Sequence, residues 1–189
     1  MQTKKLIIAI SGASGAIYGI RMLEVLKDVK SVETHAIIST AAEKTIKFET
    51  EYSIDTVRNF ADFYYDPADI SASIASGSFL NSGMVIIPCS MKSLSGIVNS
   101  YNDNLLTRAA DVTLKEKRKL IICPRETPLH KGHLELLLRL VDYGGMVLPP
   151  FPAFYHSPQT LSDIIDQTVG KVLDQFDIKH SLYKRWSEG

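Results

Sequence analysis

Residues 6–15 read LIIAISGASG, and this stretch decides the fold. Its five consecutive apolar residues, three of them isoleucine, are typical of a strand buried on both faces. A turn with two glycines follows at 11–15, and apolar residues then recur at helical spacing over 17–26. A buried strand that passes through a glycine turn into an amphipathic helix predicts an α/β protein with a parallel sheet.

The same alternation of strands and helices continues along the chain. Further strands are predicted at 34–38, 84–88, 119–123 and 146–148, and further helices at 41–49, 94–98, 105–114, 134–141 and 161–176. Thr160 is a predicted cap of the last helix, with Asp163 at the third helical position. Residues 50–81 carry no clear periodicity, and within them an ordered polar loop is expected at 71–78. The prediction is an α/β, three-layer Rossmann-like (flavodoxin-like) fold with a mostly parallel, doubly wound sheet, in a single domain over 1–189.

Composition excludes several classes of function. Lys+Arg and Asp+Glu both count 21, so no net positive charge favours nucleic acid or an anionic membrane. Cys89 and Cys123 match neither a metal site nor a disulfide framework, and we expect reduced thiols. His130, His133 and His156 lack the partners that a metal centre needs. No stretch has the length of a signal peptide or a membrane span, so a cytoplasmic protein is expected.

In doubly wound folds, ligands bind beyond the carboxyl ends of the strands. The segments at predicted strand ends are 11–15, 39–40, 75–78, 88–93 and 123–128. Glycines in the first of these allow a close backbone approach, and amides at a helix N-terminus attract phosphate. No Gly-Lys-Ser/Thr follows, so it is not a P-loop, and glycines at 12, 15 and 19 do not fit the dinucleotide pattern. A phosphate cradle or a plain tight turn remains.

Each of the other polar segments has two interpretations. The hydroxyls of 88–93 and of 76–78 are candidates for flavin contacts or for helix caps. The pair Arg125-Glu126 is either a structural ion pair or part of a ligand site. Arg108 and Lys115 are seven residues apart and share one helix face, where they clamp a phosphate or are solvated. The aromatic loop at 151–156 is a substrate wall or core packing.

Taken together, these segments resemble the flavin prenyltransferase (UbiX-like) family, which includes the B subunits of phenolic-acid and hydroxyarylic-acid decarboxylase systems. The resemblance runs from about residue 5 to residue 186, and its most specific stretches are 11–15, 75–79, 88–93, 105–116, 124–128 and 149–158. It implies an enzyme that transfers a dimethylallyl group from dimethylallyl phosphate to reduced FMN, first at N5 and then at C6. The product, prenylated FMN, would pass to a UbiD-type decarboxylase. Family members form dodecamers with the flavin at subunit interfaces.

The resemblance also assigns roles to residues. The implied FMN contacts are Gly12, Ala13, Ser14, Ser39, Ser90, Met91, Lys92, Ser93 and Arg125, with Ser76 and Ser78 from a neighbouring subunit. The implied substrate contacts are Arg108, Lys115, Tyr155, Lys171 and Trp186. The implied catalytic residues are Ser14, Glu49, Arg108, Lys115 and Glu126, of which Glu126 is expected to act electrostatically. Lys171 stands where other members carry arginine, which keeps the charge but loses the bidentate geometry.

Other functions were weighed against this one. An FMN-binding accessory or carrier subunit of an aromatic-acid decarboxylase would need no cationic substrate set. A flavin-dependent cysteine decarboxylase would carry a Pro-x-Met-Asn motif, whereas 88–91 here reads PCSM. The glycine spacing disfavours an NAD-dependent dehydrogenase.

Overall fold

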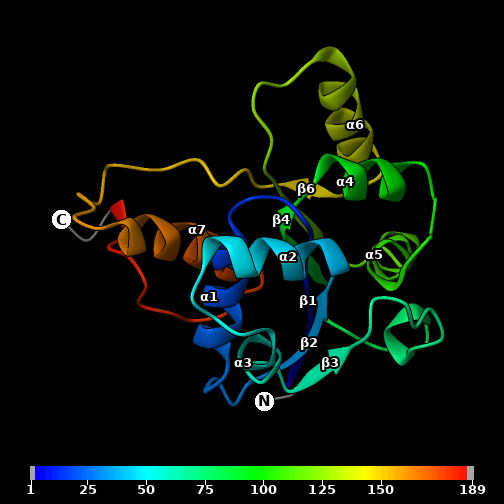
Figure 1. The fold of residues 1–189 in the computed structure, drawn as a ribbon, viewed down its shortest axis with the longest axis horizontal. Helices are drawn as coiled ribbons and strands as arrows, with labels where there is room; N and C mark the ends of the chain where they lie inside the picture. The colour runs from blue at the N-terminus through cyan, green and yellow to red at the C-terminus, as the bar shows by residue number, and fades with distance from the viewer. Residues whose placement is uncertain (1–2, 187–189) are drawn as a thin grey trace.

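A computed structural model describes residues 3–186 as an α/β fold around one six-stranded sheet (Figure 1). The strands, all parallel, are β1 (Lys4–Ile10), β2 (Val32–Ile38), β3 (Phe63–Tyr65), β4 (Met84–Cys89), β5 (Leu120–Pro124) and β6 (Met146–Val147). Their order across the sheet is β3-β2-β1-β4-β5-β6. The helices are α1 (Ala16–Leu26), α2 (Thr40–Glu49), α3 (Ile54–Arg58), α4 (Met91–Val98), α5 (Leu105–Lys115), α6 (Lys131–Asp142) and α7 (Leu161–Gln175). The predicted three-layer, flavodoxin-like fold is confirmed.

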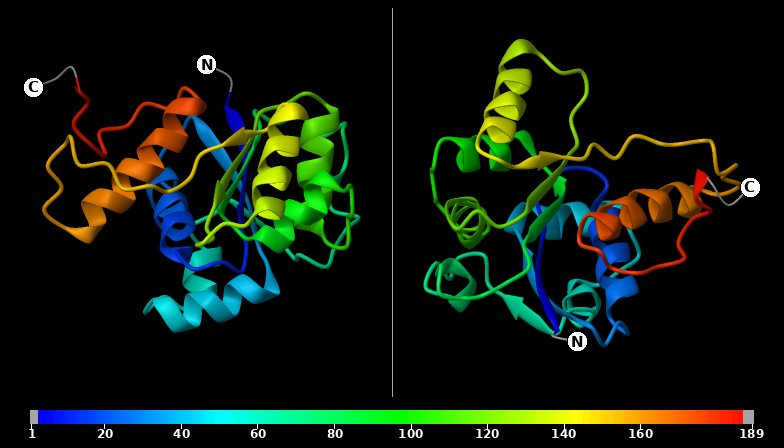
Figure 2. Two further views of the ribbon diagram at one scale, coloured as in Figure 1. Left: turned by 90° about the horizontal axis from the view of Figure 1, so that it is seen from above. Right: turned by 180° about the vertical axis from the view of Figure 1, so that it is seen from behind.

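Two hydrophobic cores lie on the two faces of the sheet. Because side chains alternate along a strand, Ile8 and Ile10 of β1 join one core while Ile7 and Ala9 join the other. Helices α1, α2, α3 and α7 cover the first face, and α4, α5 and α6 cover the second (Figure 2). The predicted strand, buried on both faces, therefore owes its stability to two layers of helices.

The winding of the chain reverses between β1 and β4. From β1 the chain moves outward to β2 and β3, and it then returns to the other side of β1 as β4. The loops after β1 and β4 consequently diverge from each other, and this topological switch point is where doubly wound folds open a crevice. Helices α1 and α4 both begin at this edge, so their free amides lie there as well.

Residues 50–81 contain more regular structure than their unclear periodicity indicates. They contain α3, the edge strand β3 and a 3₁₀ turn at Ser73–Ala75. Only three residues long and partly exposed, β3 lacks the apolar run that marks the other strands. Its position is fixed by the carboxylate of Asp62, which accepts hydrogen bonds from the backbone N (2.7 Å) and the hydroxyl (2.9 Å) of Thr34 on β2. That contact is not visible in local periodicity.

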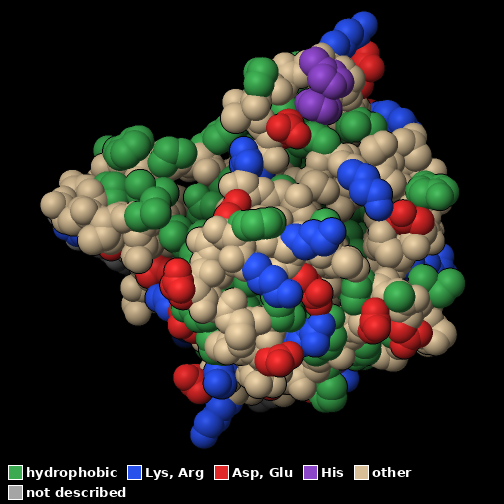
Figure 3. All heavy atoms as spheres, viewed as in Figure 1, with side chains coloured by type: hydrophobic (Ala, Val, Ile, Leu, Met, Phe, Trp, Pro, Cys, Tyr) green, Lys and Arg blue, Asp and Glu red, His purple; other side chains and the backbone are tan. Residues whose placement is uncertain are grey.

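The segment between β6 and α7 projects from the body of the molecule (Figure 1). It carries the exposed aromatic side chains of Phe151, Phe154 and Tyr155, and apolar side chains gather over this projection in Figure 3. Helix α7 then begins with the predicted capping box, in which Thr160 and Asp163 bond each other's backbone amides. Within residues 3–186, every helix is too short or too polar to span a bilayer.

Candidate active site

The loops that follow β1 and β4 are joined by one buried hydroxyl. Ser11 Oγ donates a 2.9 Å hydrogen bond to the carbonyl of Pro88 and accepts a 2.7 Å bond from the backbone N of Ser90. Pro88 lacks an N–H, and the register between β4 and β5 shifts between Ile86 and Cys89. The Ser11 hydroxyl thus bonds the Pro88 carbonyl and the Ser90 amide at the end of β4, where the strand pairing is irregular. These two bonds hold the loops after β1 and β4 together.

The turn after β1 requires its glycines. A Cβ on Gly12 would lie 2.3 Å from Cβ of Ala41, so a side chain there would push the start of α2 away. Gly15 has φ +91°, a conformation that L side chains rarely adopt. Ser14, between them, is exposed. The turn therefore presents its backbone and one hydroxyl at the switch point.

Glu49, at the end of α2, reaches this turn from 34 residues away. Its Oε2 accepts hydrogen bonds from the backbone N of Gly15 (2.8 Å) and of Ala16 (3.2 Å). A carboxylate is favourable here because the N-terminus of α1 carries partial positive charge. In this chain the two free amides at the start of α1 therefore bond a carboxylate, that of Glu49.

Ser39 and Ser90 cap helices and also lie at the carboxyl edge. Ser39 Oγ accepts from the backbone N of Ala42 (3.1 Å), and Ser90 Oγ accepts from that of Ser93 (3.3 Å). The helix-cap interpretation therefore holds for Ser90, Ser39 caps α2 in the same way, and both side chains are half-buried. Beside them Lys92 is exposed and pairs with Asp103 (3.1 Å).

A hollow of about 330 Å³ opens beside the first turn. Its lining comes from three segments of the chain: Ser14, Gly15, Tyr18, Pro124, Arg125, Glu126, Thr127, Pro150 and Phe151. The backbone of Arg125 is fixed by a hydrogen bond from its N to the carbonyl of Cys89 (3.1 Å), while its buried Nε has no hydrogen-bond partner in the part of the chain that the structure describes. Across residues 3–186 no ion pair joins Arg125 to Glu126, so the structural interpretation of this pair is wrong. Tyr18 and Pro150 line the hollow although the sequence does not predict them as site residues, whereas Phe151 belongs to the aromatic loop expected as a substrate wall.

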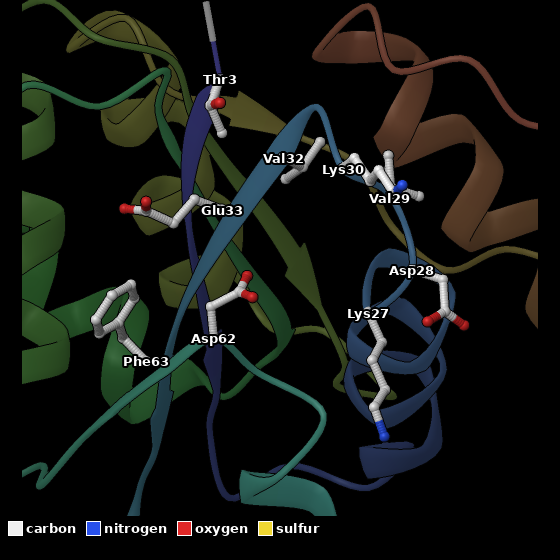
Figure 4. Close-up of a pocket in the computed structure, with 9 residues that line it drawn as sticks. All are labelled: Thr3, Lys27, Asp28, Val29, Lys30, Val32, Glu33, Asp62 and Phe63. Carbon is white, nitrogen blue, oxygen red and sulfur yellow. The ribbon is translucent and has the colours of Figure 1, made fainter.

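A larger hollow, about 630 Å³, lies at the opposite edge of the sheet (Figure 4). Two of its acidic side chains are engaged within the fold: Asp62 holds Thr34, and Glu33 pairs with Lys5 (3.2 Å). It lies at the amino ends of the strands, away from the switch point, and none of the predicted site residues lines it. Size therefore does not identify the site, whereas position in the topology does.

The predicted substrate residues form two further groups on the same chain. On α5, Arg108 pairs with Asp111 (3.4 Å), and Lys115 pairs with Glu116 (2.5 Å) beside the turn that carries Ser76 and Ser78. None of these residues lines the 330 Å³ hollow.

Tyr155, on the projecting segment, meets the ring of Trp186, which follows α7, edge to face at 5.7 Å between centroids. Lys171 is exposed on α7. These residues are likewise outside the lining of the 330 Å³ hollow. One copy of the chain thus holds the predicted residues as three separate groups.

The buried thiols are unsuited to nucleophilic catalysis. Burial raises the pKa of Cys89 to about 12 and also raises the pKa of Cys123. Burial, followed by the nearby Cys123, raises the pKa of Tyr18 beside the hollow. All three groups are therefore protonated at neutral pH.

A doubly wound sheet with glycine- and hydroxyl-bearing loops at its switch point defines a protein that binds a phosphate-bearing cofactor such as a flavin nucleotide. The family model described as "Flavoprotein" matches residues 1–187. A flavin prenyltransferase UbiX of Salmonella typhimurium is 60% identical over 185 residues, covering 97% of this chain and 98% of that protein. The chain belongs to the flavoprotein family and, within it, to the UbiX flavin prenyltransferases.

Solved structures agree with this assignment. AnUbiX (PadA1), crystallised with FMN and dimethylallyl pyrophosphate, has a TM-score of 0.95 and 43% identity, with 98% of each chain covered. A dodecameric FMN-dependent UbiX-like decarboxylase of Escherichia coli O157:H7 has a TM-score of 0.94 and 49% identity, covering 96% of this chain and 98% of that one. The peptidyl-cysteine decarboxylase EpiD, at 22% identity and a TM-score of 0.60, covers 81% and 84% and shares the fold alone.

Proposed function

We propose that this chain transfers a dimethylallyl group from dimethylallyl phosphate to reduced FMN and so forms prenylated FMN. The observation that carries the proposal is the 330 Å³ hollow, in which Ser14, Arg125 and Glu126 meet at the switch point of a UbiX family member. The observed contacts of the turn with Glu49 support an anion-binding role for its amides.

The residues at the carboxyl edge fit FMN. The buried Arg125 Nε has no partner in the described chain and is a donor for a polar group of the flavin. The turn at 12–15 and the hydroxyls of Ser39, Ser90 and Ser93 supply further donors, with Met91 and Lys92 beside them. When bound, reduced FMN supplies the N5 nucleophile and the C6 carbon of the second bond.

The remaining polar residues suit the departure of phosphate. In the overall reaction the carbon–oxygen bond of the donor would break, phosphate would leave with the electron pair, and C1 of the donor would bond N5, which gives up its proton. The double bond of the dimethylallyl group would then take up a proton at C2 while C3 bonds C6, and C6 would lose its proton. Arg108, Lys115 and Lys171 are cations that stabilise the growing negative charge on the phosphate. Because Lys171 offers a point charge and not a planar fork, we propose that it contributes charge more than orientation.

Other side chains of the site move protons or exclude water. We propose that Ser14 donates a hydrogen bond near flavin N5 and that Glu49, already at the turn, accepts the C6 proton or relays it. Glu126, exposed at the rim, acts through its charge. The edge-to-face pair of Tyr155 and Trp186 supplies an aromatic wall, with the Tyr155 hydroxyl directed to the phosphate.

We propose that a complete site needs more than one copy of the chain. The three groups of site residues lie apart on one chain, and the projecting aromatic segment exposes Phe151 and Phe154 to 74% and 68%. A homo-oligomer, a dodecamer by likeness to the solved UbiX-like neighbour, would bring the groups together. We further propose a UbiD-type decarboxylase as recipient of the product. The two free thiols fit a single-domain protein of the reducing cytoplasm.

The test is anaerobic incubation of the chain with reduced FMN and dimethylallyl phosphate or the pyrophosphate, followed by mass spectrometry of the flavin. Product with the monophosphate supports the proposal, and product with the pyrophosphate alone would correct the donor. The variants Lys115→Met and Tyr155→Phe separate a catalyst from a carrier. A catalyst loses product formation while FMN binding persists, whereas a carrier shows no product even without substitution.

A further inference from the structure

The turn that carries Ser76 and Ser78 is held by a residue that has no role in the proposed function. Phe79 N donates to the carbonyl of Ser76 (3.1 Å), and the hydroxyls of Ser76 and Ser78 lie 2.8 Å apart. Two carbonyls of this turn accept hydrogen bonds from the guanidinium of Arg118: Nη2 bonds Gly77 O (2.7 Å) and Nη1 bonds Phe79 O (2.8 Å). The planar guanidinium of Arg118 thus holds the turn at two points, the carbonyls of Gly77 and Phe79.

Arg118 is itself fixed by the end of α5. Lys117 adopts φ +53°, and the backbone N of Arg118 then donates to the carbonyl of Thr113 (2.9 Å). This reversal ties Arg118 to the last helical turn, which also carries Lys115. Arg118 therefore connects the turn at 76–79 to the helical turn that carries Lys115, through its guanidinium on one side and its backbone N on the other.

Lys115 lies against the backbone of the same turn. A Cβ built on Gly77 would meet Lys115 Nζ at 2.9 Å and Glu116 Oε1 at 2.2 Å, so a side chain here would displace the ends of both side chains from the turn. The ammonium pairs with Glu116 (2.5 Å), and Lys115 lowers the pKa of that carboxyl. Two exposed hydroxyls and one ammonium therefore stand on one rigid unit. Because the Lys115 side chain is long and flexible, its ammonium can leave the carboxylate of the exposed Glu116 and bind an incoming anion instead.

We propose that Arg118 is a positioning residue that holds the Ser76–Phe79 turn against Lys115, so that the two hydroxyls and the ammonium bind a phosphoryl group as one unit. The inference rests on the proposed function for the identity of the phosphate donor, but anion binding by this unit does not require prenyl transfer. Because both N–H groups of the fork are used, lysine can replace Arg118 only in part.

The far side of the turn has a separate anchor, so that loss of Arg118 leaves the protein folded. The ring of Phe79 packs edge-on against the buried His35 of β2, with 4.9 Å between centroids. Lys5 Nζ lies over the same ring at 5.1 Å. Substitution of Arg118 thus frees the carbonyls of the turn while its apolar base stays in place.

The experiment is calorimetric titration of inorganic phosphate into the protein saturated with FMN, which fills the flavin phosphate site beforehand. Arg118→Met is expected to weaken phosphate binding about tenfold, the scale of one charge-assisted hydrogen bond. Arg118→Lys should restore part of the loss. Lys117→Met, which removes a neighbouring exposed cation, should change binding less than twofold.

A double-mutant cycle separates positioning from direct contact. If Arg118 acts through Lys115, the variant Lys115→Met/Arg118→Met binds phosphate no more weakly than Lys115→Met alone. Additive losses, unchanged binding in Arg118→Met, or absence of phosphate binding by the unsubstituted protein would each overturn the inference. Should Arg118→Met fail to fold, Gly77→Ala, which pushes Lys115 from the turn, must reproduce the loss. If phosphate binds as expected but no prenylated flavin forms, the proposed function fails and this inference stands.

Discussion

Asp174 on α7 bonds three residues near the end of the described chain and so holds that segment against the body of the protein. Its replacement by asparagine should lower the stability of the fold by an amount that can be worked out from these contacts. Its Oδ1 bonds His180 Nε2 (3.1 Å) and Arg185 Nη2 (2.6 Å), and its Oδ2 accepts from the Tyr183 hydroxyl (2.7 Å). These contacts hold the segment that ends at Trp186 beside Tyr155. Asp174→Asn keeps the shape of the side chain and removes its charge.

The magnitude follows from the pKa of Asp174. Burial alone would raise it, but hydrogen bonds from Arg185, Tyr183 and His180 outweigh burial and lower the pKa from 3.8 to about 2. A shift of this size corresponds to about 2 kcal/mol of stability. One fifth of the side chain is exposed, so screening by water leaves about 1–2 kcal/mol. The melting temperature should fall by about 2–8 °C at pH 7.

The sign of the pH dependence is fixed by the direction of the shift. A carboxyl whose pKa is depressed in the folded state stabilises the protein above the unfolded value of 3.8, and this contribution is lost as pH falls towards 2. The difference in melting temperature between the unsubstituted protein and Asp174→Asn should therefore be constant from pH 7 to pH 5 and shrink below about pH 4. Asp177→Asn, an exposed change of the same kind, is the matched control.

The fluorescence of Trp186 reports release of the segment that Asp174 holds, since Trp186 is the only tryptophan of the chain. Being 81% exposed, it should show little change in emission wavelength. Its fluorescence anisotropy should fall in Asp174→Asn because the segment gains freedom, and it should stay unchanged in Asp177→Asn. Equal anisotropy in all three proteins, or a melting difference that persists unchanged to pH 3, would refute the assigned role of Asp174.

Two further predictions concern the switch point. Ser11→Ala leaves the backbone N of Ser90 buried without its acceptor and should lower the free energy of unfolding by about 1–3 kcal/mol, measured by denaturant melts at fixed protein concentration. An unchanged midpoint would contradict the bridging role. Arg125→Met should weaken FMN binding at least tenfold in a fluorescence titration while the melting temperature of the FMN-free protein changes little, because Nε has no hydrogen-bond partner among residues 3–186 to lose. Unchanged FMN affinity would remove Arg125 from the flavin site.

Much of the fold could be predicted from local sequence because its signals are local. The apolar runs that become β1, β4 and β5 are buried on both faces, and the capping box of α7 involves residues three apart. The edge strand β3 and the short α3 could not be predicted, since each is held by contacts with distant residues and not by an apolar run of its own. Asp62, which anchors β3 to Thr34 across 28 residues, is an example.

For the site, too, some features could be predicted from the sequence and others could not. The loops at strand ends could be located because parallel strands bring their carboxyl ends to one edge. Periodicity could not show that Glu49 reaches Gly15, that Arg118 holds the turn at 76–79, or that Asp174 gathers the segment before Trp186. These contacts depend on how helices pack on the sheet. The separation into three groups also follows from packing, because each group lies on a different layer or projection.

The most direct test of the central claim is the mass of the flavin released after anaerobic incubation of the chain with reduced FMN and dimethylallyl phosphate. We predict a flavin heavier than FMN by one prenyl unit, together with released phosphate in equal amount. The product should disappear in Lys115→Met, a variant that still binds FMN. Recovery of unmodified FMN alone, from protein that demonstrably binds both FMN and phosphate, would contradict the assignment of the site as a flavin prenyltransferase centre.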